Sequence, residues 1–229
     1  MNEKNPTLCI VAGPNGSGKT STTVQLLHNE WAENSLYINP DNIAQEQYGD
    51  WNSPVAVLKA AELATKMRYE CLRKRQDFVF ETVFSSDEKL AFVEEAKKAG
   101  LKTNVVLLYS DKITYGNSQE LPGGWSVDKA AEEANKYTKT VLEELKRAGA
   151  TPTMVTIGNE VNYNFLNLSS WDGYCAMAEI SKTVKDAGIK TAFSFAAPEK
   201  ASDIQYIIEQ LGYACEKYEG AGYDYIGVN

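Results

Sequence analysis

The sequence has few of the residues that build metal centres, disulfides or membrane spans. It contains a single histidine, His28, which excludes a histidine-rich metal site. Its four cysteines, Cys9, Cys71, Cys175 and Cys215, are scattered without a CxxC pair, and this predicts reduced core thiols in a cytoplasmic protein. No apolar run approaches the roughly 20 residues of a membrane span. We also see no secretory signal at the start of the sequence.

Positive charge is scarce as well. The 229 residues include 23 Lys and Arg against 31 Asp and Glu, which gives a net charge of −8. An acidic chain without a basic stripe is a poor candidate for binding a phosphate polymer, so we expect no nucleic acid partner and no membrane partner. The composition, 43% hydrophobic and 24% charged, is typical of a globular protein and excludes disorder, collagen and a coiled-coil rod.

Short apolar runs alternate with longer amphipathic ones along the chain, which is typical of βαβ units around a mostly parallel sheet. Seven strands are predicted, at residues 8–12, 35–38, 78–83, 104–109, 154–158, 190–195 and 223–228. Amphipathic helices are expected between them, for example over residues 54–74, 87–99 and 127–148. One long polar loop, residues 110–126, departs from this rhythm, and such loops are uncommon unless they carry function.

A phosphate-binding pattern follows the first predicted strand directly, because residues 13–20 read GPNGSGKT and match GxxxxGK[ST]. Glycines let successive backbone N–H groups point at a phosphate, and the following helix presents its positive end there. Lys19 would bind the β- and γ-phosphates, and the Thr20 hydroxyl would bind Mg²⁺. The alternative is a chance glycine-rich turn. The predicted nucleotide-binding residues are Gly13, Asn15, Gly16, Ser17, Gly18, Lys19, Thr20 and Ser21, with Thr20 as the metal ligand.

Three segments, AGPNGSGKTS, INPDNIA at 38–44 and FVFETVFSS at 78–86, resemble the zeta-toxin family of P-loop kinases over about residues 5–110. The resemblance implies that Asp41 is the base for the hydroxyl that receives phosphate, and that Glu81 helps to hold the substrate and the metal region. The alternatives are a turn or cap role for Asp41 and a solvated strand-end charge at Glu81. The family's lid arginines have no counterpart, since residues 110–126 contain no arginine.

From about residue 104 the sequence resembles a different family. VVLLYSD, PGGWSVDKAAEEANKYTKTVLEELKRAGATPTMVTIGNEVN and YDYIGVN are similar to glycoside hydrolase family 53, the endo-β-1,4-galactanases, which are TIM barrels. The resemblance implies that residues 104–229 form the third to sixth barrel strands and that Glu160, in Gly158-Asn159-Glu160, is the acid/base carboxylate. A retaining glycosidase needs a second carboxylate about 5 Å away. That nucleophile, on the seventh barrel strand, has no match, so we expect Glu160 to be vestigial.

The two resemblances meet within one strand, at residues 104–111, with no linker between them. We interpret the chain as an engineered chimera: residues 1–110 a P-loop kinase-like segment, residues 104–229 a partial TIM barrel, and residues 1–229 one fused α/β domain. A P-loop order of 2-3-1-4, extended by barrel units, predicts a single mostly parallel sheet ordered 2-3-1-4-5-6-7. The former barrel-interior face should be apolar and be shielded by helix 54–74 or 87–99, or by a homodimer.

The leading functional interpretation is a chimera that keeps a Walker A loop. It would bind ATP or GTP with Mg²⁺, or inorganic phosphate or sulfate, with little or no catalysis. One alternative is a zeta-toxin-like kinase that phosphorylates a sugar hydroxyl. The other is an inactive structural design whose loop holds nothing.

Overall fold

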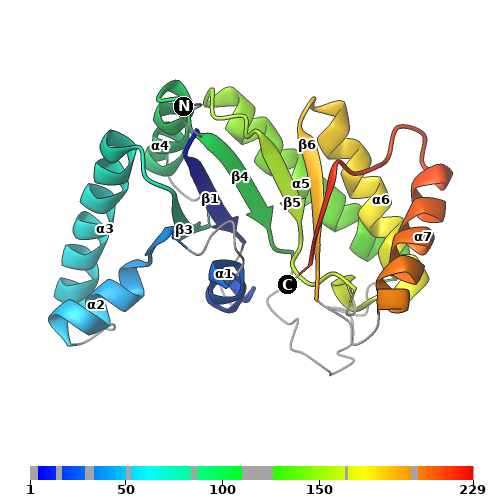
Figure 1. The fold of residues 1–229 in the computed structure, drawn as a ribbon, viewed down its shortest axis with the longest axis horizontal. Helices are drawn as coiled ribbons and strands as arrows, with labels where there is room; N and C mark the ends of the chain where they lie inside the picture. The colour runs from blue at the N-terminus through cyan, green and yellow to red at the C-terminus, as the bar shows by residue number, and fades with distance from the viewer. Residues whose placement is uncertain are drawn as a thin grey trace.

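A computed structural model describes residues 5–13, 17–28, 34–49, 53–83, 87–109, 126–162, 165–196 and 201–228. They form one seven-stranded sheet in which every pairing is parallel, in the order β2-β3-β1-β4-β5-β6-β7 (Figure 1). The predicted α/β class and strand order are therefore confirmed.

The strands are short and lie close to their predicted positions. They are β1 (Thr7–Ala12), β2 (Leu36–Ile38), β3 (Phe78–Thr82), β4 (Lys102–Leu107), β5 (Met154–Ile157), β6 (Lys190–Phe195) and β7 (Tyr225–Val228). The helices are α1 (Lys19–Leu27), α2 (Pro40–Tyr48), α3 (Pro54–Lys74), α4 (Asp87–Lys98), α5 (Val127–Arg147), α6 (Ser170–Asp186) and α7 (Ala201–Lys217), and a 3-10 turn, η2 (Phe165–Asn167), precedes α6. The largest difference is at β4, which begins and ends two residues earlier than predicted.

Strand β4 joins the two halves of the sheet. On one side it pairs with β1, where the Leu108 amide donates to the Ala12 carbonyl at 2.8 Å. On the other side it pairs with β5, where the Gly158 amide donates to the Leu107 carbonyl at 2.8 Å. We call β1–β3 with α1–α4 the amino-terminal half, and β5–β7 with α5–α7 the carboxyl-terminal half. One continuous hydrogen-bonded ladder therefore connects the segments that resemble two different families.

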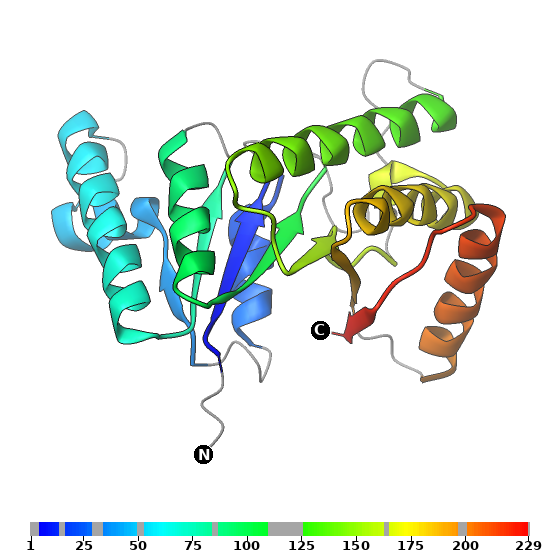
Figure 2. The same ribbon diagram turned by 90° about the horizontal axis from the view of Figure 1, so that it is seen from above.

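The main hydrophobic core lies between one face of the sheet and helices α3 to α7. It contains alternate strand residues such as Ile10, Phe80, Ile157 and Phe193. Figure 2 shows α4, α5 and α6 along this side of the sheet. A smaller core on the opposite face packs α1, through Leu26, against the remaining residues of β1, β3 and β4. This second core covers the face in the amino-terminal half only.

The prediction that helix 54–74 or 87–99 shields the former barrel-interior face is wrong. Ala60 of α3 and Phe92 of α4 belong to the main core, on the same face as α5 and α6. The physical reason is the direction of the connections. From β2 onward each connection that returns to the sheet moves the same way across it, and right-handed crossovers then place all their helices on one face. The connection from β1 to β2 runs the other way and places α1 alone on the opposite face.

The expectation of an apolar face holds in part, because the hollow on this face is lined by apolar residues such as Leu26 and Met154 and also by polar ones. The side chains of the carboxyl-terminal half that point away from the helices include Thr156, Ala192 and Ser194, with Asn104 next to them on β4, and these are small or polar. Among the described residues no helix of this half covers them (Figure 2). Such a face needs less shielding than the apolar surface that we expected.

Two expectations from composition can be compared with the fold. None of the helices in the described ranges is long and apolar enough to cross a membrane. All four cysteines lie in the described ranges as free thiols, and three of them are buried. Burial raises the pKa of the Cys9 thiol to about 12.

Candidate functional site

The predicted phosphate loop lies at the carboxyl edge of the sheet, where β1 ends. The Gly13 amide donates to the carbonyl of Thr82 at the end of β3, 3.2 Å away. A Cβ atom at position 13 would stand 2.5 Å from the Ser17 hydroxyl oxygen and 2.9 Å from the Leu108 Cβ. Only glycine therefore fits between the start of the loop and β4. Asn15 and Gly16, two further predicted loop residues, lie outside the described residues.

The second half of the loop leads directly into α1. Gly18 takes a left-handed backbone conformation, φ 80°, and precedes Lys19, the first residue of the helix. The Lys19 ammonium donates to the Gly13 carbonyl at 3.1 Å, so it lies beside the end of β1. Ser21 is exposed on the first turn. Ser17 is 8% exposed, and its hydroxyl has no hydrogen-bond partner within the described residues. A buried, unpaired hydroxyl that faces the loop suits an anionic ligand.

A chain of hydrogen bonds runs from α1 across the edge to β2. The Thr20 hydroxyl donates to the Glu81 Oε2 at 3.1 Å, and the Tyr37 hydroxyl donates to the other Glu81 oxygen. Asn39 Nδ2 donates to the Tyr37 hydroxyl at 2.7 Å. Burial, and next the Glu81 carboxylate, raise the pKa of the Tyr37 phenol, so it remains a neutral donor. Glu81 therefore lies beside Thr20, not as an isolated charge at the strand end.

The donor set at this edge suits a hard divalent cation. Mg²⁺ prefers oxygen ligands and is commonly held by one or two protein oxygens together with substrate phosphates. The Thr20 hydroxyl and the Glu81 carboxylate are such oxygens, and Tyr37 holds the carboxylate in place. Sequence analysis missed Tyr37 and Asn39. Only Asn39 left a signal, because it precedes Pro40 as a helix N-cap would.

Asp41 lies in the first turn of α2, the helix that follows the end of β2. Its backbone amide donates to the Asn39 side chain at 2.8 Å, so the NPDN segment is a true helix cap, as the alternative interpretation held. The Asp41 side chain is exposed, which leaves its carboxylate open to a substrate. The structure thus brings Gly13, Lys19, Thr20 and Glu81 together, with Asp41 on the same edge of the sheet.

The galactanase-like motif lies on the same edge, at the tip of β5. Asn159 Nδ2 donates to the Gln25 Oε1 of α1 at 2.8 Å, and the Ser194 hydroxyl of β6 donates to the Asn159 Oδ1 at 3.2 Å. The amide of Asn159 therefore links the helix that follows the phosphate loop to the carboxyl-terminal half of the sheet. Glu160 is half-buried in the next position, with a positive φ of 51°.

The turn that carries this motif is tightly packed. Gly158 has φ 67°, and a Cβ atom there would stand 2.4 Å from Val161 Cγ1. The Asn162 side chain bonds the Ala196 backbone twice, at 2.9 and 3.2 Å. A non-glycine residue with positive φ, such as Glu160, is held in that conformation by these surroundings.

No arginine lies at this edge of the sheet, although all four are in the described ranges. Three of them lie on the opposite edge of the sheet, at the ends of α3 and α5: Arg73, Arg75 and Arg147. Arg68 is buried on α3, against the rings of Phe80 and Phe92. Burial lowers the pKa of Arg68, and Glu88, at 2.9 Å, opposes that shift. The arginines are engaged by Glu88 (Arg68), Glu70 (Arg73), the Ala99 carbonyl (Arg75) and Glu144 (Arg147).

Residues 47–229 match the model of glycosyl hydrolase family 53. The match begins in α2 and so includes β3 and α4, which the sequence resemblance assigned to the kinase-like segment. Matching relatives include an arabinogalactan endo-β-1,4-galactanase of Thermothelomyces thermophilus, 33% identical over 36% of this chain and 26% of the relative. An endo-β-1,4-galactanase of Bacillus subtilis is 29% identical over 52% of this chain and 30% of the relative. The chain thus spans about a third or less of the relatives it matches.

The solved structures that are similar to this chain include a GH53 domain and a toxin–antitoxin system. The GH53 catalytic domain of Ignisphaera aggregans has a TM-score of 0.48 and 24% identity, covering 62% of this chain and 40% of that one. The PezAT chromosomal toxin–antitoxin system of Streptococcus pneumoniae has a TM-score of 0.42 and 12% identity, covering 96% of this chain and 88% of that one. The interpretation of residues 13–21 therefore depends on this chain's own motif and geometry, since the family match begins after them.

Proposed function

Because the chain belongs to glycosyl hydrolase family 53 over residues 47–229, and because a phosphate loop precedes that match, we propose that it is an engineered fold chimera whose loop binds a nucleoside triphosphate with Mg²⁺ and which catalyses little or no reaction. The observation that supports this most is the bond between the Thr20 hydroxyl and the Glu81 carboxylate, beside Lys19 at the start of α1. Adenine and guanine nucleotides are both candidates, and so is inorganic phosphate.

In this proposal, one group of residues binds the phosphates and another binds Mg²⁺. Backbone N–H groups at the start of α1 and the helix dipole favour the phosphates, and the Lys19 ammonium would move from the Gly13 carbonyl to them. Thr20 and Glu81 would hold Mg²⁺ through their oxygens. Mg²⁺ held by these residues would supply positive charge that offsets the charge of the phosphates. All of these groups belong to β1, α1 and β3, which pack together in the described structure.

The low catalytic power follows from the positions of the arginines. An arginine that reaches the transferring phosphoryl group is worth about 10³–10⁵ in rate. All four arginines of this chain are engaged on the helical layer, away from Lys19 and Thr20, and residues 110–126 supply none. Lys19 and the metal alone would then face the charge of the transition state. ATP would be held and hydrolysed slowly.

The surroundings of the galactanase-like motif, Gly158-Asn159-Glu160, also support little or no cleavage of sugars. Glu160 stands beside Asn159, whose amide is bonded to Gln25 of α1 and to Ser194. Helix α1 belongs to the phosphate-loop segment, so a foreign element lies against the motif. The described sheet is open, with β2 and β7 as its edges, where a barrel would be closed. Glu160 is therefore a remnant of the parent fold in this proposal.

A second candidate function is phosphoryl transfer to a sugar hydroxyl, and the position of Asp41 favours it. Its exposed carboxylate lies at the start of α2, on the edge that carries Lys19 and Glu81. A carboxylate there can accept the proton of an attacking hydroxyl. This candidate predicts acceptor-dependent ADP release that is lost in Asp41→Asn, whereas the chimera proposal predicts no acceptor dependence.

Titration of a fluorescent nucleotide in the presence of Mg²⁺ tests the proposal. Lys19→Ala should weaken binding at least about tenfold, because a charge-assisted contact worth about 1.5–3 kcal/mol is lost. Thr20→Val should weaken binding in Mg²⁺ much more than in EDTA. Lys139→Ala, a substitution on the far side of α5, is the matched loss of one lysine and should change nothing. Equal affinity of Lys19→Ala and the parent protein would end the proposal.

A further inference from the structure

The two oxygens of the Glu81 carboxylate face two different elements of the fold. Tyr37 of β2 pairs with Val79, a residue of the smaller core, and Glu81 follows Val79 by two positions on β3. Tyr37 and Glu81 therefore lie on the side of the sheet on which α1 packs. The Tyr37 hydroxyl donates to Glu81 Oε1, and the Thr20 hydroxyl donates to Glu81 Oε2 at 3.1 Å. One oxygen is thus directed toward β2 and the other toward the start of α1.

The direction of the hydrogen bond from Tyr37 follows from Asn39, the N-cap residue of α2. The Asp41 backbone amide can only donate, so the atom of the Asn39 side chain that accepts from it, at 2.8 Å, is Oδ1. The Asn39 Nδ2 then donates to the Tyr37 oxygen at 2.7 Å. A phenol carries one proton, and with its oxygen accepting from Asn39 that proton points to Glu81. The cap of α2 thereby makes the Tyr37 hydroxyl a donor to the carboxylate.

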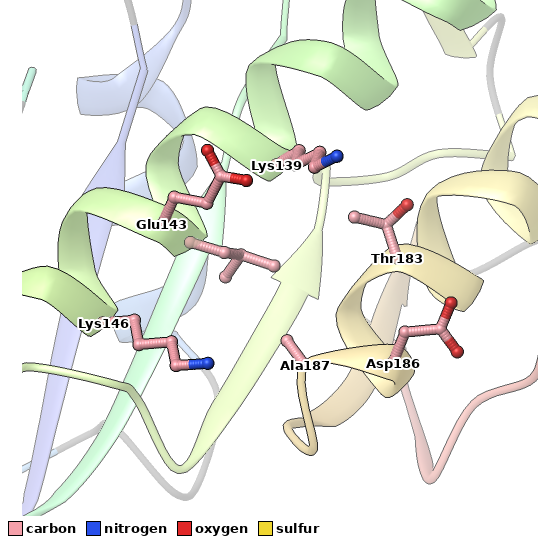
Figure 3. A pocket seen from close by; sticks show the side chains of 7 residues that line it. Lys139, Glu143, Lys146, Thr183, Asp186 and Ala187 are labelled. Carbon is pink, nitrogen blue, oxygen red and sulfur yellow. The ribbon is translucent and has the colours of Figure 1, made fainter.

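The Glu81 carboxylate also differs from other carboxylates in its neighbours. Within the described residues, its hydrogen bonds come from neutral hydroxyls and it forms no ion pair. By contrast, the groove of about 350 Å³ between α5 and α6 is lined by Glu143 and Asp186 together with Lys139 and Lys146 (Figure 3). A carboxylate that is bonded only by hydroxyls keeps its negative charge for a cation at the start of α1.

Mg²⁺ and Ca²⁺ use carboxylates differently. Ca²⁺ takes about six to eight oxygen ligands in flexible geometry, and it readily takes both oxygens of one carboxylate. Mg²⁺ is smaller, requires near-octahedral geometry and keeps several waters beside its protein and phosphate ligands. In Glu81, Oε1 already accepts a hydrogen bond from Tyr37, so Oε2 is the oxygen beside Thr20 that can meet a cation. Ligation through one oxygen suits Mg²⁺ better than Ca²⁺.

We infer that Tyr37 determines which divalent cation accompanies the nucleotide, because it engages one oxygen of Glu81 and leaves the other beside Thr20. This inference rests on the proposed function, in which Thr20 and Glu81 hold the metal. On binding, the Thr20 hydroxyl would turn its proton away from Glu81, while the hydrogen bond from Tyr37 would persist. Tyr37 is a positioning residue, since it acts on the cation only through Glu81.

Titration of the full chain with a fluorescent ATP analogue, once in Mg²⁺ and once in Ca²⁺, tests the inference. The parent protein should bind more tightly in Mg²⁺. Tyr37→Phe removes only the hydroxyl and should lower the ratio of the two affinities at least about fivefold, because a hydrogen bond to a charged group is lost. Tyr69→Phe is the matched control, since the Tyr69 hydroxyl also bonds a glutamate, Glu95, at 3.5 Å between α3 and α4. It should leave the ratio unchanged.

Asn39→Asp is a second variant that leaves the tyrosine in place. Aspartate caps a helix about as well as asparagine, so the start of α2 should be preserved. The new carboxylate would accept at the position where the Asn39 Nδ2 donates, and the Tyr37 hydroxyl would then donate to it instead of to Glu81. Asn39→Asp should therefore lower the same affinity ratio as Tyr37→Phe. Thermal unfolding without nucleotide or metal verifies that both variants fold.

The outcomes separate the inference from the proposed function. If Lys19→Ala weakens nucleotide binding but Tyr37→Phe leaves the ratio unchanged, or weakens binding equally in both cations, the inference is wrong and the proposed function stands. If Tyr37→Phe does not fold, Asn39→Asp decides the question in the same way. Equal affinity in both cations, or tighter binding in Ca²⁺, would overturn the inference from the parent protein alone. A parent protein that binds no nucleotide in either cation would overturn both.

Discussion

The two halves of the sheet are covered differently. In the amino-terminal half, α3 and α4 pack on one face, and α1 packs on the other through Leu26. In the carboxyl-terminal half, α5 to α7 pack on the same face as α3 and α4, and the opposite face is a groove with small and polar residues. Among the described residues, the amino-terminal half therefore has helices on both faces of the sheet, and the carboxyl-terminal half has helices on one face.

The difference shows what determines whether a parallel sheet is covered on both sides. A right-handed crossover places its helix according to the direction in which the chain moves across the sheet. Only the connection from β1 to β2 moves opposite to the others, so only α1 lies on the second face. A barrel segment adds strands in one direction only, because in its parent fold the bare face is the packed interior. Among the described residues, no helix lies on the corresponding face of β5 to β7.

Two neighbouring residues of β6 test the comparison most strongly. Phe193 belongs to the main core and is 1% exposed, whereas Ala192, 5% exposed, lines the hollow on the opposite face. Phe193→Ala should lower the free energy of unfolding by about 3–5 kcal/mol through a core cavity. Ala192→Leu should change it by less than about 1 kcal/mol, because the groove has room for the added atoms. Urea unfolding measures both, and equal losses would show that the second face is packed after all.

The next prediction concerns Asn159, whose side chain links α1 to the carboxyl-terminal half of the sheet. Asn159→Ala should cost about 1–2 kcal/mol of stability, because the Gln25 and Ser194 side chains both lose a partner. Gln25→Ala should then add little in the Asn159→Ala background, and a double-mutant cycle should give a coupling of at least about 0.5 kcal/mol. Strictly additive losses would mean that α1 and the tip of β5 do not depend on each other.

Helix caps supply the smallest comparison between the halves. The Ser126 hydroxyl accepts a hydrogen bond from the Lys129 amide at the start of α5, whereas Ser53 makes no such bond at the start of α3. Ser126→Ala should cost about 1 kcal/mol in thermal or urea unfolding. Ser53→Ala should cost only a few tenths, since it lacks the side-chain bond. The reverse order would contradict the cap geometry of these two helices.

Much of the architecture follows from short-range patterns in the sequence. Apolar runs such as LCIVA and KTAFSF identify buried strands, and the P-loop order extended by barrel units gives the strand order that the structure confirms. The right-handedness of crossovers then determines the face on which each helix lies. The same rule also places α3 and α4 with α5, but the prediction assigned them to the wrong face. The polar residues on the face opposite α5 and α6 were visible too, because Asn104, Thr156 and Ser194 interrupt their strands on the same side.

Other features required the structure. The bond between Gln25 and Asn159 joins residues 134 positions apart, in segments that resemble different families. Tyr37 gives no sequence signal, since it lies in an ordinary apolar strand, yet it holds Glu81 beside Thr20. The roles of Asp41, Glu81, Glu160 and the loop residues stay predictions. The lid region, residues 110–125, lies outside the described residues.

The central claim is that one continuous sheet, joined through β4, carries a phosphate loop that binds a nucleotide. Scanning calorimetry with and without Mg²⁺ and nucleotide tests it most directly. At a nucleotide concentration about 100 times the Kd, binding adds about 2.7 kcal/mol to the stability of the whole cooperative unit. The account predicts a single unfolding transition that moves upward as a whole. Two transitions of which the nucleotide moves only one, or a single transition that it does not move, would contradict the account.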